Sequence, residues 1–221
     1  MVDFIDIPTD GIIFIDTSAT DYEGGWIQEK KVYDQDRADR ILKFRRLLEN
    51  QNNWLSIPEV AAEILEGIKG TEDYIQRLRE ERSSLGNLVS INKERQRILQ
   101  MIKERNASSP DVLTPDLISR VNQLFPQVNE IFLANKGETN DYLTDQKLVT
   151  YAAAYAETAN PRDPFVYLWS EDRPMLKTFK AIANKLDLRN TATLTQEGKR
   201  IIPCVTAHSL REYREKQRAA S

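Results

Sequence analysis

The segment GIIFIDTSA (residues 11–19) begins as an apolar run and stops abruptly on Asp16, which is followed by Thr17 and Ser18. β-Branched and aromatic residues after a glycine favour a buried strand over residues 12–15. A carboxylate and hydroxyl groups at the end of a core strand indicate a site there.

The rest of the chain repeats this pattern of a strand followed by a helix. The segment WLSIP (54–58) resembles a strand that runs into a helix at Pro58, and FVYLW (165–169) precedes a helix expected from about 174 to 186. A helix is expected near 35–50 and a last strand over 200–205. This alternation predicts an α/β fold with a parallel sheet.

Between about residues 70 and 135 the pattern changes to long amphipathic helices, with breaks near 83–84 and 106–110. We interpret this block as a helical insertion into an α/β core of about 1–66 and 140–208. A C-terminal helical extension is expected over about 207–221. The whole chain, residues 1–221, is long enough to form one domain of this kind.

The amino-acid composition of the chain narrows the classes of function that we expect for it. The net charge of −3 excludes a bulk cationic field, so any binding of nucleic acid must come from local patches. The apolar run 12–15 is too short for a signal-peptide core or a membrane span, so we expect a cytoplasmic protein that does not bind membranes. With one cysteine and one histidine, carboxylates are the main candidate metal ligands, and these suit Mg²⁺ or Mn²⁺.

Four acidic residues stand at related places. Asp16 and Asp172 follow strand-like runs, Glu63 lies in the first turns of the helix after WLSIP, and Asp145 lies at a helix start. Ligands of parallel α/β sheets gather at the carboxyl ends of the strands, so these acids could meet in space. Clustered carboxylates repel one another and generally need a cation. A bound Mg²⁺ or Mn²⁺ could activate water against a phosphodiester.

Each acid also has an ordinary structural explanation. Asp145 is favoured at a helix start by the helix dipole, Asp172 is typical of a turn, and Glu63 is typical of a solvated helix face.

Four segments in this order, IIFIDTSA, SIPEVAAEILEG, LTDQKLVTYAAAYA and VYLWSEDRPM, resemble the signature segments of PIN-domain ribonucleases. The resemblance implies a three-layer α/β/α sandwich with a central, mainly parallel sheet. It also implies an Mg²⁺- or Mn²⁺-dependent endoribonuclease that acts on single-stranded or structured RNA. The residues that match the four acids of the family are Asp16, Glu63, Asp145 and Asp172.

Four further residues are assigned to the expected site because they lie close to the acidic residues in the sequence. Ser18 and Ser170 match the hydroxyl positions beside the acids, and Arg173 and Lys177 follow Asp172 closely enough to contact a substrate. The register of the acids has alternatives, which are Glu59 in place of Glu63, Asp141 in place of Asp145, and Glu171 in place of Asp172.

The stretch from Arg77 to Arg105 carries an excess of basic residues and is a candidate phosphate-facing surface. The same pattern is typical of a solvated helix face with ion pairs between neighbouring turns.

Two other functions are compatible with the sequence. The chain could be a non-catalytic PIN-like scaffold whose helical insertion binds a protein or RNA partner, and a homodimer is compatible with either function. A phosphatase of the haloacid dehalogenase type also places an aspartate after the first strand. Such a phosphatase needs a second aspartate two residues later, where this chain has Ser18.

Overall fold

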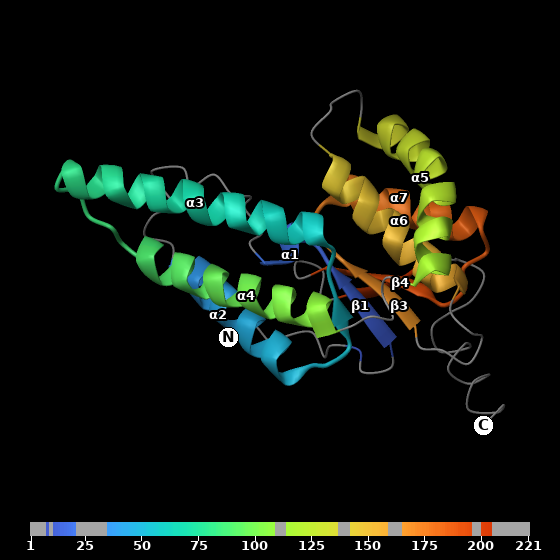
Figure 1. The fold of residues 1–221 in the computed structure, drawn as a ribbon, viewed down its shortest axis with the longest axis horizontal. Coiled ribbons are helices and arrows are strands. Elements are labelled where there is room, and N and C mark those ends of the chain that lie inside the picture. The colour runs from blue at the N-terminus through green and yellow to red at the C-terminus, as the bar shows by residue number, and fades with distance from the viewer. Residues whose placement is uncertain are drawn as a thin grey trace. The chain divides into compact units, whose positions relative to one another are not determined.

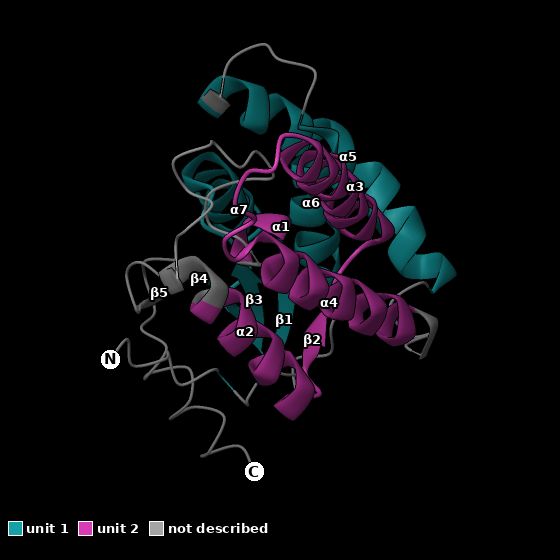
Figure 2. Cartoon of the chain, turned by 90° about the vertical axis from the view of Figure 1, so that its left-hand side faces the viewer, with its two compact units in different colours: residues 1–16, 109–221 teal, residues 17–108 magenta. Residues whose placement is uncertain are grey.

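The computed structural model describes Pro8 and residues 11–20, 35–108, 114–136, 142–158, 165–195 and 200–204. The chain divides into two compact units, which Figure 2 shows in different colours. Unit 1 comprises Met1–Asp16 and Ser109–Ser221, and unit 2 comprises Thr17–Ser108. Figure 1 labels the helices and strands of both.

The strands of unit 1 are β1 (Gly11–Ile15), β3 (Phe165–Trp169), β4 (Thr191–Thr195) and β5 (Arg200–Pro203). They lie in the order β1-β3-β4-β5, in which β1, β3 and β4 are parallel and β5 is antiparallel to β4. Ile15 pairs with Trp169, and Trp169 pairs with Leu194. The carboxyl ends of β1 and β3 therefore lie side by side.

These strands confirm the α/β class and the predicted strands at 12–15 and 165–169. The last strand ends at Pro203, earlier than predicted. The sequence pattern does not reveal β4, because its sequence TATLT looks polar. Four of its five residues are nevertheless buried, and threonine is β-branched and suits a packed strand. The hydroxyl group of Thr191 is satisfied inside the unit by donating to the Leu188 carbonyl at 2.6 Å.

Three helices complete unit 1: α5 (Pro115–Lys136), α6 (Leu143–Thr158) and α7 (Arg173–Lys185). Thr114 caps α5, since its hydroxyl accepts the Leu117 N–H at 3.2 Å. Helix α6 packs against β3, α5 and α7, and the Tyr155 ring meets the Phe14 ring of β1 edge-on, with centroids 5.7 Å apart. The predicted helix at 174–186 is confirmed as α7.

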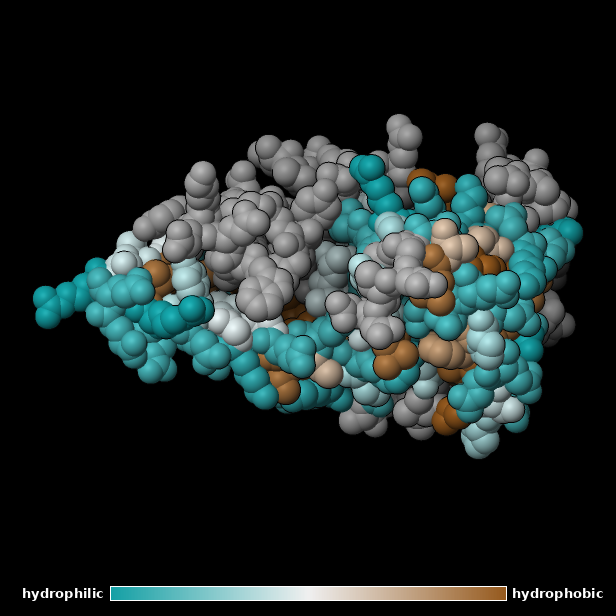
Figure 3. Space-filling model, turned by 90° about the horizontal axis from the view of Figure 1, so that it is seen from above, coloured by the Kyte–Doolittle hydropathy of each residue, from teal (hydrophilic) through white to brown (hydrophobic). Residues whose placement is uncertain are grey.

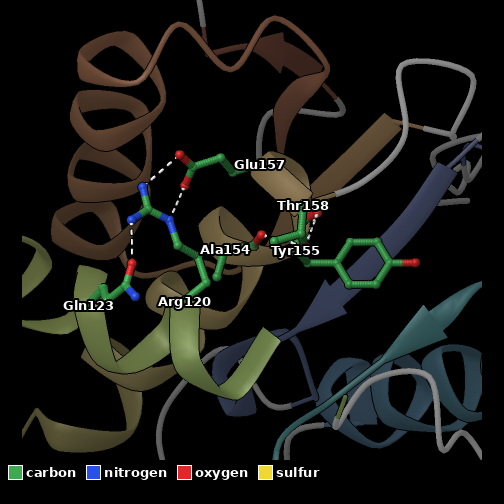
Figure 4. A network of polar contacts seen from close by, with 6 residues as sticks. All are labelled: Arg120, Gln123, Ala154, Tyr155, Glu157 and Thr158. Carbon is green, nitrogen blue, oxygen red and sulfur yellow. Dashed lines mark hydrogen bonds and ion pairs between the residues drawn. The ribbon is translucent and has the colours of Figure 1, made fainter. Parts of the chain in front are cut away.

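A bidentate ion pair joins α5 to α6. The Arg120 guanidinium donates to both carboxylate oxygens of Glu157 at 2.6 Å and also to Gln123 at 3.0 Å (Figure 4). The hydrogen bond to Glu157 raises the pKa of Arg120 above its ordinary value. This two-point contact fixes the pairing of α5 with α6 more specifically than a single ion pair would.

Unit 2 contains α1 (Thr17–Thr20), α2 (Gln35–Asn50), β2 (Trp54–Leu55), α3 (Pro58–Glu80) and α4 (Leu88–Ser108). The predicted helix at 35–50 is confirmed, and Pro58 starts α3 as expected. The strand expected over 54–58 is only two residues long. Helix α3 continues without interruption through residues 66–70, where the sequence pattern separates the core from the helical insertion.

The interior of unit 2 includes charged groups. Helix α4 packs against both α2 and α3, and its buried Glu94 forms ion pairs with Arg45 at 2.5 Å and Arg97 at 2.8 Å. Arg95, which is 4% exposed, donates to the Thr71 hydroxyl at 3.2 Å. Desolvation lowers the pKa of the Arg95 guanidinium to about 10.

The described helices include none that is long and apolar enough to cross a membrane. The C-terminal extension expected over 207–221 lies outside the described residues. The domain boundaries derived from the sequence stay predictions, as does the three-layer PIN-like arrangement.

Candidate functional site

The centre of the candidate site is Asp16, which directly follows β1 and is only 3% exposed. Its backbone N–H donates to the Trp169 carbonyl at 3.0 Å, which extends the pairing of β1 with β3 by one residue. Its carboxylate atom Oδ2 accepts a hydrogen bond from the Ser170 hydroxyl at 2.9 Å. Because Ser170 directly follows β3, the contact joins the carboxyl ends of two neighbouring parallel strands.

Asp172 is attached to the same network through the backbone. Its N–H donates to the Ser170 hydroxyl oxygen at 2.9 Å, so this hydroxyl both accepts from Asp172 and donates to Asp16. The Asp172 side chain is the N-cap of α7, where Oδ1 accepts the Met175 N–H at 3.1 Å. Asp172 therefore has a structural role as the residue that starts a helix.

The other two predicted acids lie on helices. Asp145 is half-buried in the first turn of α6, which belongs to unit 1 together with Asp16 and Asp172. Glu63 is half-buried on α3 in unit 2, where its Oε2 accepts a hydrogen bond from the Thr17 hydroxyl at 2.7 Å. Asp16 and Thr17 are consecutive in the chain. Asp16 contacts Ser170 of the segment VYLWSEDRPM, and Thr17 contacts Glu63 of the segment SIPEVAAEILEG.

Thr17 is a residue that sequence reasoning did not assign to the site. The signal that could have identified it is its hydroxyl group directly after Asp16. Ser18, the hydroxyl residue that the family resemblance selects instead, is half-buried on α1.

The alternatives for the acids are only partly described. Glu59 lies in the first turn of α3 and Glu171 between β3 and α7, and both are half-buried. Asp141 lies outside the described residues.

The oxygen atoms at this edge of the sheet are the kind that Mg²⁺ and Mn²⁺ prefer. Within the part of the chain that the structure describes, no group of three or more histidine, cysteine, aspartate or glutamate side chains is close enough to hold a metal ion. Ser170 links the Asp16 carboxylate to the backbone of Asp172, whereas the assembly of the four predicted ligands stays a prediction.

The residues expected to bind substrate differ in their surroundings. Ser170 is completely buried, and its hydroxyl already has two partners, so in this structure it positions the Asp16 carboxylate. Arg173 and Lys177 lie one turn apart at the start of α7. Basic side chains at the start of a helix near the candidate site can contact a phosphate group of a nucleic acid. The contact of Arg173 and Lys177 with a substrate stays a prediction.

Cys204 can be set aside as a nucleophile. Its side chain is buried, and desolvation raises the pKa of the thiol to about 12. Because the thiolate is the reactive form, this cysteine is inert at neutral pH.

Replacing Ser170 with alanine is expected to lower the free energy of unfolding by about 1–3 kcal/mol. The change removes a donor from the buried Asp16 carboxylate and an acceptor from the Asp172 N–H. Urea denaturation measures the effect. The matched control is Ser119→Ala on the exposed face of α5, and equal stabilities of the two variants would contradict the positioning role of Ser170.

Comparison of the chain with protein-family models, with curated proteins and with solved structures gave no match. The likeness to PIN domains therefore rests on the four segments of the sequence.

Proposed function

We propose that this protein is a metal-dependent endoribonuclease that hydrolyses phosphodiester bonds with a carboxylate site. The observation that carries the proposal is the pair of buried residues Asp16 and Ser170 at the carboxyl ends of the parallel strands β1 and β3. A buried carboxylate held at this edge of a parallel sheet is typical of a functional site rather than of core packing. The order of the four PIN-like segments supports the choice of reaction.

The donor chemistry at this edge fits a hard divalent cation. Carboxylate oxygens of Asp16 and Asp172 lie at the ends of β1 and β3, where hydrogen bonds from Ser170 and Met175 hold Asp16 Oδ2 and Asp172 Oδ1 in place. The proposed ligands of Mg²⁺ or Mn²⁺ are Asp16, Asp145 and Asp172, together with Glu63 from the sequence match. When bound, such an ion would lower the pKa of a coordinated water and offset the charge of the phosphate group.

Side chains of the protein position the carboxylates and the RNA. Ser170 holds Asp16 in one orientation, so that little reorganisation is needed when substrate binds. Asp172 is fixed both by its N–H and by its capping side chain. Arg173 and Lys177 would bind phosphate oxygens, which positions the RNA backbone without reading its sequence.

The first test is the melting temperature of the protein as Mn²⁺ is added. An ion that binds only the folded state stabilises it by about 2.7 kcal/mol at a hundredfold excess over its dissociation constant. For a chain of this size, that corresponds to a rise of roughly 5–10 °C. The rise is expected in the wild type and is expected to be much smaller in Asp145→Asn.

The control is Asp187→Asn, which removes an exposed carboxylate that lies just beyond the C-terminal end of α7. This variant is expected to respond to Mn²⁺ like the wild type. A flat curve for the wild type would contradict the metal site and would favour the non-catalytic scaffold. Equal rises in the wild type and Asp145→Asn would exclude Asp145 as a ligand.

A further inference from the structure

Helix α7 begins at the candidate site, and all of its charged residues are basic. Its sequence, RPMLKTFKAIANK, contains four basic residues and no acidic residue. Asp172, one of the proposed metal ligands, is the N-cap of this helix. The basic residues therefore start beside the candidate site and recur along the whole length of α7.

Three of the basic residues form a row along the helix, which we call the α7 row. Successive residues of an α-helix are about 100° apart, so Arg173, Lys177 and Lys180 lie within an arc of about 60°. Arg173 and Lys177 are exposed, and Lys180 is half-buried. The buried side chains of α7 are centred on the opposite side of the helix, and they are Met175, Thr178, Phe179, Ile182 and Ala183. The α7 row is therefore directed away from the core of unit 1.

Stability of the folded chain does not explain the α7 row. In the part of the chain that the structure describes, no cation of the row forms an ion pair, whereas Arg45, Arg120 and Arg189 each pair with a carboxylate. Arg173 also lies in the first turn of α7, where the positive end of the helix dipole disfavours a cation. Cations that are costly at this place and lie beside a candidate site indicate a role in binding.

Charge, rather than apolar contact, is the property of α7 that suits a partner. The large apolar side chains that are exposed among the described residues lie on other elements, and they are Val89, Ile118, Leu143 and Ile202. On the face of the molecule drawn in Figure 3, the described apolar side chains form small groups among hydrophilic ones. A row of cations is complementary to a chain of phosphate groups.

The α7 row ends at Lys180. One turn later the same side of the helix carries Asn184, whose amide group donates to the carbonyl oxygens of Lys180 and Cys204, both at 2.8 Å. Asn184 therefore holds the end of α7 in place and offers no charge to a phosphate group. From Arg173 to Lys180 the helix rises about 10 Å.

We propose that a single strand of the RNA substrate leaves the candidate site along α7, with successive phosphate groups contacting Arg173, Lys177 and Lys180. The inference rests on the proposed nuclease function, because that function places the bond to be cut beside the start of α7. It adds Lys180 as a binding residue about two turns from the site. One narrow row of cations follows one backbone, whereas a duplex presents two.

The test compares Lys180→Gln with Lys185→Gln in the full chain. Lys185 is exposed on the same helix, about 140° around it from Lys180, and lies in the last turn, where the helix dipole favours a cation. The affinity for a fluorescently labelled twelve-residue oligouridylate is measured by anisotropy in EDTA, so that no cleavage occurs.

Lys180→Gln is expected to weaken binding about fivefold in about 0.1 M salt and to reduce the logarithmic salt slope by about 0.7, which corresponds to one lost phosphate contact on a single strand. Lys185→Gln is expected to change the affinity less than about twofold. Lys180→Arg retains the positive charge and is expected to bind like the wild type. Melting temperatures of the three variants verify that each is folded.

The length of the substrate provides a second readout, measured as cleavage in Mn²⁺. Lys180 lies about 12 Å along α7 from Asp172, so a dinucleotide held at the reacting site does not reach it. Lys180→Gln is therefore expected to raise KM about fivefold for the twelve-residue substrate with kcat unchanged. The same variant is expected to cleave the dinucleotide UpU like the wild type.

Several outcomes would overturn the inference. Equal losses for Lys180→Gln and Lys185→Gln would show an effect of net charge, and equally tight binding of a duplex would exclude a path for one strand. Binding of a polyglutamate peptide with the same dependence on Lys180 would assign the α7 row to an acidic protein. RNA cleavage that depends on Asp16, together with normal binding by Lys180→Gln, would refute this inference and leave the proposed function standing.

Discussion

Asp16→Asn is expected to abolish RNA cleavage, with a loss of at least about a hundredfold, while the protein remains folded. Asparagine has nearly the same shape as aspartate, and its side-chain oxygen can still accept the hydrogen bond that Ser170 donates to Asp16. The substitution removes the negative charge that the proposed cation requires. Because Asp16 is 3% exposed, its charge acts in surroundings where water screens it poorly.

The measurement is the rate of cleavage of a labelled single-stranded RNA in Mn²⁺, with circular dichroism to verify folding. Asp187→Asn serves as the control, since it makes the same chemical change at an exposed residue. Full activity of Asp16→Asn, in protein purified free of contaminating nuclease, would refute the proposed mechanism. Loss of activity in both variants would also contradict it, because the effect would then follow net charge rather than the Asp16 site.

Gly11→Ala is expected to destabilise the protein strongly, although it adds only one methyl group. A β-carbon on Gly11 would overlap the Phe165 carbonyl oxygen and would lie 2.5 Å from a ring carbon of Tyr167. The carbonyl oxygen belongs to the backbone of the paired strand β3, so it cannot move aside as a side chain can. Relief of the clash requires β1 and β3 to separate, at a cost of about 2–4 kcal/mol.

Thermal unfolding checks this expectation, because a loss of that size lowers the melting temperature by roughly 5–15 °C. Gly70→Ala is the matched control. It makes the same substitution in a helix, where no described atom beyond the chain neighbours and the helix's own backbone is within 4 Å of the new carbon, and it is expected to raise the melting temperature slightly. Equal melting temperatures for Gly11→Ala and the wild type would show that β1 and β3 pair more loosely than their register indicates.

Local sequence patterns predict most of the elements around the candidate site. An apolar run of β-branched and aromatic residues is buried on both faces of a parallel sheet, so β1 and β3 can be recognised one at a time. The caps of α5 and α7 are short-range hydrogen bonds between neighbouring residues. Such features depend on a few consecutive side chains and are visible without a structure.

The sequence pattern fails where burial depends on distant partners. The threonines of β4 look polar, and they are buried because β3 and β5 pair with the two edges of this strand. The positioning role of Ser170 is hidden for a similar reason. Its hydroxyl bonds to a residue 154 positions away, and no local pattern reveals such a contact.

The sequence by itself determined the α/β class, the strands that end on acidic residues and the oxygen chemistry of the candidate ligands, because periodicity and composition act over a few residues. Only the tertiary structure decided that Asp16 and Ser170 meet, that Gly11 must lack a side chain, and that α3 continues through its two glycines. These facts arise from the register of β1 against β3 and from packing along α3. Register and packing set distances between residues that are far apart in the chain, and the order of amino acids does not display those distances.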